Sequence, residues 1–194
     1  MPQKYVAFDE RMVKSRHRSG FRQFIKDKPT KWGIKLWVLA DSSNGYTVDF
    51  NTYIGRAAGQ TIGGHGLGYD VVMHLMAPYF GKGYQFLVDN FYSTLTLFKH
   101  LYDQGVAMGT ILDSRCSFPR ALKKRIEWAK GQERGSMRWV RDSPCLVLQW
   151  VENKLLSMIT TVGNTNEQGQ VTRRLRTDGE WEERLSLKFL RPTT

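Results

Sequence analysis

The sequence predicts a mixed α/β fold in which strands come first and helices then alternate with further strands. The runs 32–41 and 46–55 alternate in polarity and read as a hairpin, because Asn44-Gly45 between them suits a tight turn. Residues 69–80 then carry apolar side chains at helical spacing, and strand-like and helical runs take turns after them. This order is typical of a sheet whose later strands are joined through helices.

The N-terminal part is predicted to supply three strands. Residues 4–13 read as a short strand that ends near Asp9, and with the hairpin it gives an antiparallel meander. Residues 14–31 read as a loop dense in positive charge, part of which must pack because three apolar side chains interleave with the charges. Residues 56–68 form a Gly-rich loop without the spacing of a nucleotide-binding motif.

The middle of the chain alternates helix and strand. The expected elements are a helix at 69–80, a strand at 84–89, a helix at 93–104 capped by Ser93 or Thr94, a strand at 106–112 and a basic helix at 118–130. Right-handed crossovers should make the later strands parallel to the first strand. The strands that carry Asp9 and Asp89 are then expected to lie side by side.

The sequence changes character after about residue 134. Three short strand-like runs with turns at 142–144 and 152–153 predict a second antiparallel patch. The polar, charged tail from residue 163 predicts an extended hairpin or a loosely ordered arm. We therefore expect a core domain over 1–130, followed by a β-rich segment and charged tail over 131–194.

The net charge of the chain indicates which classes of partner it binds. The 194 residues contain 29 Lys and Arg against 18 Asp and Glu, a formal net charge of +11, and such a basic chain tends to meet nucleic acid. No apolar stretch is long enough for a spanning helix and no secretory leader begins the chain, so we expect no membrane partner. Cys116 and Cys145 form no C-x-x-C pair, which argues against a structural zinc site and for reduced thiols.

Two aspartates stand at polar breaks in apolar runs, Asp9 after VAF and Asp89 after QFLV. A carboxylate at the end of a buried strand needs compensation, and a divalent metal shared by both residues is one compensator. The alternative is that each Asp only caps its strand or the next helix. Glu10 should point to the opposite face of its strand and is a poor ligand candidate. Asp41 and Asp49 read as turn and surface residues.

A basic run between the first strand and the hairpin is the candidate DNA-binding segment, because a phosphate backbone lying across it would reconcile its charge with an acidic centre nearby. The candidate residues are Lys14, Arg16, Arg18, Arg22, Lys26, Lys28 and Lys31.

Four stretches in a fixed order carry a family resemblance: FDERMV at 8–13, the segment KPTKWGIKLWVLAD within 21–55, the segment ending VDNFYST within 66–94, and GTILDSRCSFPRALKK at 109–124. These stretches resemble the transposase domain of piggyBac-type elements and their domesticated relatives. The last stretch keeps Arg115 of an Arg-rich string in that family.

The resemblance implies a ribonuclease-H-like mixed sheet flanked by helices, with three catalytic aspartates that bind two Mg²⁺ or Mn²⁺ ions. Asp9 looks like the first of these aspartates and Asp89 like the second. The family's third lies in a GGVD-type string, which does not occur here and is expected downstream of residue 194. Whether this chain acts as an enzyme is therefore left open.

The function that the resemblance implies is metal-dependent DNA cleavage and strand transfer in the nucleus, by a domain that is incomplete as given. The alternative is a domesticated relative that binds DNA or chromatin without cutting it. A basic single-strand or RNA-binding module without metal chemistry is a third hypothesis. The expected partners are DNA and, as an option that the sequence leaves open, a second copy in a homodimer.

Overall fold

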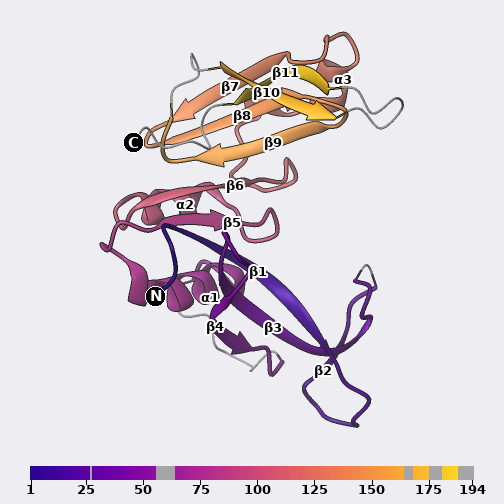
Figure 1. Ribbon diagram of the computed structural model, residues 1–194, viewed down its shortest axis with the longest axis vertical. Helices are drawn as coiled ribbons and strands as arrows, with labels where there is room; N and C mark the ends of the chain where they lie inside the picture. The colour runs from indigo at the N-terminus through magenta and orange to yellow at the C-terminus, as the bar shows by residue number, and fades with distance from the viewer. Residues whose placement is uncertain (27, 56–63, 164–167, 175–180, 188–194) are drawn as a thin grey trace.

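The computed structural model describes residues 1–26, 28–55, 64–163, 168–174 and 181–187. Within these residues, nine strands form one mixed sheet and two more form a separate antiparallel pair (Figure 1). The order along the large sheet is β2-β3-β1-β5-β6-β9-β8-β7, and β4 also pairs with β3. The mixed α/β fold predicted from the sequence is confirmed.

The strands are β1 Tyr5–Lys14, β2 Arg22–Phe24, β3 Trp32–Asp41, β4 Thr47–Thr52, β5 Gln85–Val88, β6 Val106–Thr110, β7 Met137–Asp142, β8 Cys145–Val151, β9 Leu155–Thr160, β10 Gln168–Arg174 and β11 Trp181–Leu187. The helices are α1 Leu67–Met76, α2 Leu95–Tyr102 and α3 Arg125–Ala129, with short 3₁₀-helices η1 Ala77–Tyr79 and η2 Arg120–Leu122.

The N-terminal meander forms as predicted, with β3 antiparallel to both β1 and β4. The first strand does not end near Asp9, however. It continues to Lys14 because β3 stays paired with it along its whole length, from Val6 opposite Asp41 to Lys14 opposite Gly33. The basic loop also contains a short strand, β2, which pairs with the start of β3.

The helical connections give parallel strands, as predicted. β5 is parallel to β1 and β6 is parallel to β5. The helix α2 between β5 and β6 is capped by Thr94, whose hydroxyl accepts a hydrogen bond from the Leu97 N–H at 3.1 Å. The strands that carry Asp9 and Asp89 are therefore neighbours in the sheet.

The single basic helix predicted over 118–130 is wrong. Residues 120–122 and 125–129 form two short helices, separated by Lys124 in the left-handed backbone region at a φ of 56°. The cause is the Arg138 guanidinium of β7, which donates to the carbonyls of Leu122 at 2.9 Å and Lys123 at 3.1 Å. Carbonyls that a distant side chain satisfies need no helical partner, so the chain can turn there.

The C-terminal strands β7, β8 and β9 pair antiparallel with one another, as predicted. They do not stand apart from the core, because β9 also pairs antiparallel with β6 and so extends the same sheet. β10 and β11 form the hairpin expected in the charged tail. The boundary near residue 130 between a core domain and a β-rich segment stays a prediction. Most of the Gly-rich loop expected over 56–68 lies outside the described residues.

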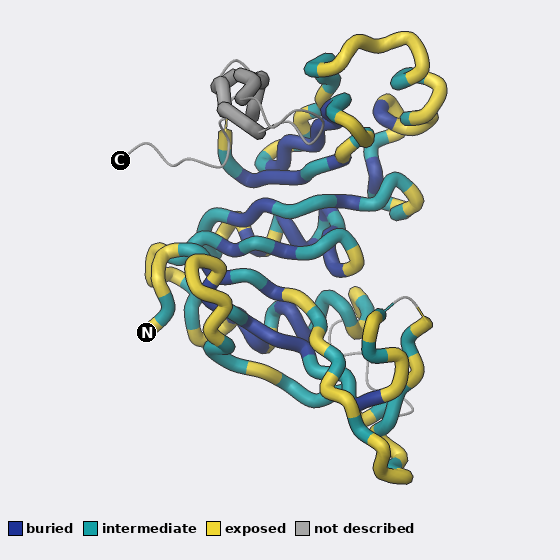
Figure 2. The backbone as a smooth tube through the Cα atoms, turned by 45° about the vertical axis from the view of Figure 1, so that its right-hand side comes forward, coloured by how far each residue is buried: buried dark blue, intermediate teal, exposed yellow. Residues whose placement is uncertain are grey.

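The core lies where α1 and α2 cover one face of the central strands. Phe8 of β1, Phe86 and Val88 of β5, and Leu97 and Phe98 of α2 are all buried in one apolar cluster. Figure 2 shows these buried segments along the middle of the molecule. The residues that directly follow Phe8 and Val88 are Asp9 and Asp89, so the core ends where the two carboxylates begin. None of the helices in the described part of the chain has both the length and the apolar character needed to cross a bilayer.

Candidate metal and nucleic-acid site

Asp9 and Asp89 lie next to each other across β1 and β5. The last pair in the parallel register is Phe8 with Val88, so each Asp takes the next position on its chain. Neighbouring strands are about 4.8 Å apart, which puts both carboxylates within reach of one small ligand. They line a hollow of about 310 Å³ together with residues of β1, β5, β6 and β9: Ala7, Phe8, Leu87, Val88, Met108, Gly109, Thr110 and Met158. The hollow lies at the carboxyl ends of β5 and β6, which is where open α/β sheets place ligands.

The two carboxylates differ in exposure, since Asp9 is exposed and Asp89 is half-buried. Asp9 is thus not a buried carboxylate at a strand end, as the sequence suggested, and water can solvate it because the pairing of β1 with β5 stops at Phe8. Asp89 does act in part as a turn residue, since its Oδ2 accepts from the Phe91 N–H at 3.2 Å. Asp9 Oδ1 accepts from the Glu10 N–H at 2.7 Å.

One oxygen of each carboxylate stays available. Within the described residues, neither Asp9 Oδ2 nor Asp89 Oδ1 has a hydrogen-bond partner. Two free carboxylate oxygens on adjacent strands are the donor set that a hard divalent cation prefers. The described residues gather no third His, Cys, Asp or Glu at any such site.

Glu10 lies on the other face of β1, as predicted, and is committed to a network of its own. Its carboxylate contacts Lys35 Nζ at 2.6 Å and Lys28 Nζ at 3.5 Å, and accepts from the Tyr92 hydroxyl at 3.1 Å. Burial raises the pKa of Glu10, but Lys35, Tyr92 and Lys28 together lower it further, so the pKa lies below its usual range. Burial and the Glu10 charge raise the pKa of Tyr92, which keeps its hydroxyl a donor.

This network ties β1 to the turn that follows Asp89. The Asp89 carbonyl accepts from the N–H groups of Tyr92 at 3.0 Å and Ser93 at 3.1 Å. The Arg115 guanidinium donates to the carbonyls of Asn90 and Phe91. The turn that follows Asp89 is thus held both by the Glu10 network and by Arg115. Sequence reasoning kept Arg115 as a family feature but missed the role of Glu10.

Gly109 is a further residue that sequence reasoning missed. It stands opposite Val88 in the β5–β6 register and lines the hollow. A Cβ at Gly109 would lie 2.1 Å from the Val88 carbonyl oxygen and 3.0 Å from the Ser93 hydroxyl. A glycine inside a strand often marks such a close backbone approach, which was the available signal.

The predicted DNA-binding residues extend away from the carboxylates on the far part of β1, on β2 and on the loops beside them (Figure 1). Lys14 is five positions beyond Asp9, about 16 Å along the strand. Five of the seven are exposed: Lys14, Arg16, Arg18, Lys26 and Lys31. Arg22 and Lys28 are half-buried and already engaged, Arg22 over the Trp32 ring and Lys28 with Glu10.

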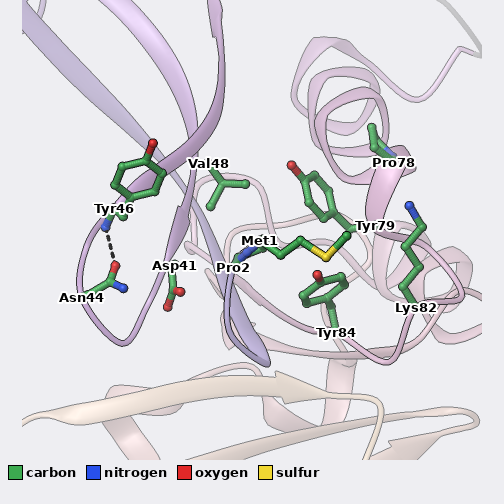
Figure 3. A pocket seen from close by; sticks show the side chains of 10 residues that line it. All are labelled: Met1, Pro2, Asp41, Asn44, Tyr46, Val48, Pro78, Tyr79, Lys82 and Tyr84. Carbon is green, nitrogen blue, oxygen red and sulfur yellow. Dashed lines mark hydrogen bonds between the residues drawn. The ribbon is translucent and has the colours of Figure 1, made fainter.

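A second hollow, of about 600 Å³, lies at the opposite ends of β1 and β5, where Met1, Tyr79 and Tyr84 point into it (Figure 3). Asp41 belongs to a turn, as predicted, but it is buried and not a surface residue. Its carboxylate accepts from the N–H groups of Gln3 at 2.8 Å and Ser43 at 2.9 Å, and these bonds lower its pKa. A carboxylate satisfied in this way is a structural group, so the hollow beside Asp9 and Asp89 remains the candidate site.

Comparison with known proteins finds a family and several relatives for this chain. The profile of a family described as Transposase IS4 matches residues 1–187. The chain is 28% identical over 163 residues to the human PiggyBac transposable element-derived protein 3. This match covers 81% of this chain and 27% of that protein. The human Chimeric ERCC6-PGBD3 protein matches at the same identity, with 81% of this chain and 15% of that protein covered.

A solved structure shares the fold. The piggyBac transposase in a synaptic complex with hairpin DNA superposes with a TM-score of 0.74 at 24% identity, over 86% of this chain and 35% of that one. The chain thus spans about a quarter or less of the length of its curated relatives. The ribonuclease-H-like mixed sheet expected from the sequence is confirmed. The chain belongs to the family described as Transposase IS4, as a transposase domain of the piggyBac type.

Proposed function

We propose that this chain contributes to metal-dependent DNA cleavage and strand transfer, with Asp9 and Asp89 as metal ligands. The observation that carries the proposal is the parallel register, which puts two carboxylates with free oxygens side by side at one end of the sheet. The family membership supports it, because the matching solved relative is a transposase bound to DNA.

Asp9 and Asp89 fit Mg²⁺ or Mn²⁺, since both ions prefer hard oxygen ligands in open sites. When bound, such ions activate an attacking oxygen and stabilise a leaving one in phosphodiester chemistry. The described residues hold no third carboxylate at a site shared with Asp9 and Asp89. The metal half of the proposal predicts that Mn²⁺ stabilises the fold through Asp9 and Asp89.

The neighbouring side chains would keep the metal ligands in place. The Glu10–Lys35–Tyr92 network and Arg115 fix the turn that carries Asp89. Lys35 and Lys28 pair with Glu10 and compensate its charge, so that it does not add to the charge of the two aspartates. Holding a reactive group to within a fraction of an ångström has a large effect on rate.

The basic run would bind the DNA backbone beside the carboxylates. Its exposed lysines and arginines are free of described ion pairs, whereas Lys28 and Lys35 are held by Glu10. A DNA backbone that lies along β1 from Lys14 would reach Asp9, five positions earlier on the same strand, and Asp89 beside it.

We propose the nucleus as the compartment for such a role. A homodimer is a further expectation, and sedimentation would test it.

Duplex affinity is expected to fall steeply with salt, with a log–log slope near −0.9 for each neutralised phosphate. Replacing Lys14, Arg16 and Arg18 by Ala should flatten the slope by about 0.9 per lost contact. Fluorescence anisotropy of a labelled duplex over a salt series measures both quantities.

The matched control replaces Lys4, Lys82 and Lys154 by Ala. These three lysines are also exposed but lie outside the basic run, so the slope should not change. An equal flattening in both triple variants would show that the DNA does not follow the basic run.

A further inference from the structure

We propose that an aromatic cluster at the far end of β1–β3 stacks on unpaired nucleotides, an inference that rests on DNA as the partner of the proposed function. The cluster, here called the aromatic tip, consists of Phe24 and Trp32. Their relative exposures are 52% and 50%. Half-exposed aromatic rings next to one another are costly to leave in water unless a partner covers them.

The aromatic tip is ordered before any partner arrives. Phe24 and Trp32 stand directly opposite each other in the β2–β3 register, and their ring centroids are 4.9 Å apart with planes tilted by 48°. The Arg22 guanidinium lies 4.6 Å from the centre of the Trp32 ring. Rings held by strand pairing and by a cation lose little conformational entropy on binding, which favours a stacking platform.

The charges around the aromatic tip identify its partner. Residues 11–35 contain nine Lys or Arg and a single acidic residue, Asp27. A second copy of the chain that met this tip with its own tip would bring the same positive charge and be repelled there. A polyanion that also exposes flat apolar faces would match both the positive charge and the exposed aromatic rings. Unpaired nucleotides are such a ligand. Base pairs in a duplex hide those faces inside the stack, so duplex DNA satisfies only the charges.

The test compares single-stranded and duplex DNA without metal. The probes are a fluorescein-labelled dT strand of about 16 nucleotides, within the span of one single-strand site, and a duplex of the same length. Titrations in EDTA use the parent, Phe24→Leu and Trp32→Leu, with Trp139→Leu as the matched control, because Trp139 of β7 is similarly exposed at 47%. Thermal unfolding confirms that each variant folds like the parent.

We expect Phe24→Leu and Trp32→Leu each to weaken dT binding by about tenfold or more, with little change in duplex binding. Trp139→Leu should change neither. Equal losses on both probes, or no loss on dT, would overturn the inference. A switch of Trp32→Leu from dimer to monomer in sedimentation would also overturn it, because the tip would then be a contact between copies.

The outcome is separable from that of the proposed function. Since the titrations contain no metal, a selective loss on dT supports the aromatic tip even when Asp9 and Asp89 prove not to bind Mn²⁺. The converse outcome is unchanged dT binding in the tip variants while Mn²⁺ stabilises the parent through the two aspartates. That combination would refute stacking at the aromatic tip and support the metal site.

Discussion

Replacing Gly109 by Ala is expected to lower the free energy of unfolding by about 3 kcal/mol, the upper part of the range for overpacking a well-filled site. The added Cβ would meet the Val88 carbonyl oxygen at 2.1 Å, and this backbone atom of β5 cannot turn aside as a flexible side chain could. Relief requires β5 and β6 to move apart directly before Asp89. Urea unfolding of both proteins measures the difference.

Gly131→Ala is the control for this substitution. A Cβ added at Gly131 would meet no atom within 4 Å, and the residue lies exposed after α3. Its replacement should change stability by only a few tenths of a kcal/mol, as surface substitutions do. Equal stabilities of Gly109→Ala and Gly131→Ala would show that β5 and β6 are not tightly joined at the site.

Replacing Lys35 by Met is expected to cost about 2 kcal/mol at neutral pH. The Lys35 and Glu10 side chains are each only 15% exposed, so removing Lys35 leaves a partly buried carboxylate short of its main partner. The loss stays below that of a fully buried pair because Lys28 and Tyr92 still contact Glu10. Lys99→Met is the control, since its ion pair with Asp142 is 41% and 47% exposed and should contribute less than about 1 kcal/mol.

The cost of Lys35→Met should depend on pH with a definite sign. The pKa of Glu10 lies below the ordinary value of 4.5, so its charged form adds stability that is fully present above that value. This stability is lost as the pH falls through the lowered pKa. The difference between parent and variant should therefore shrink in acid. A difference that stays constant or grows from pH 7 into acid would show that Lys35 acts through packing alone.

The pairing of Asp9 with Asp89 could be predicted because it depends on general rules of chain connection. Helical crossovers make β1, β5 and β6 parallel, and apolar runs of similar length then end at the same edge. The amphipathic helix α2 and its cap at Thr94 were equally readable, since the apolar spacing and the capping residue are local signals.

Features that depend on distant partners could not be predicted. β1 runs past Asp9 because β3 keeps pairing with it, and no residue of β1 itself signals this. The basic helix breaks at Lys124 because the Arg138 guanidinium, on a later strand, donates to the carbonyls of Leu122 and Lys123. The need for Gly109 follows from the position of one carbonyl on β5, which the β6 sequence does not contain.

Thermal unfolding in millimolar Mn²⁺ probes the shared metal site at Asp9 and Asp89 without requiring catalysis. An ion that binds only the native state adds RT ln(1 + [L]/Kd) to stability, about 1.4 kcal/mol at ten times its Kd. The parent is expected to gain melting temperature, and Asp9→Asn and Asp89→Asn should each lose most of that gain. Asp103→Asn, which removes an exposed carboxylate at the end of α2, should keep it.

The same variants without metal separate a ligand pair from a structural pair. Two adjacent carboxylates repel each other, so either Asn variant should match or exceed the parent in stability when no ion is present. That result, together with a loss of the Mn²⁺ gain in both variants, is what a shared metal site predicts. A parent that does not respond to Mn²⁺, or an Asn variant strongly destabilised in its absence, would contradict the metal site and leave Asp9 and Asp89 as caps of their strands.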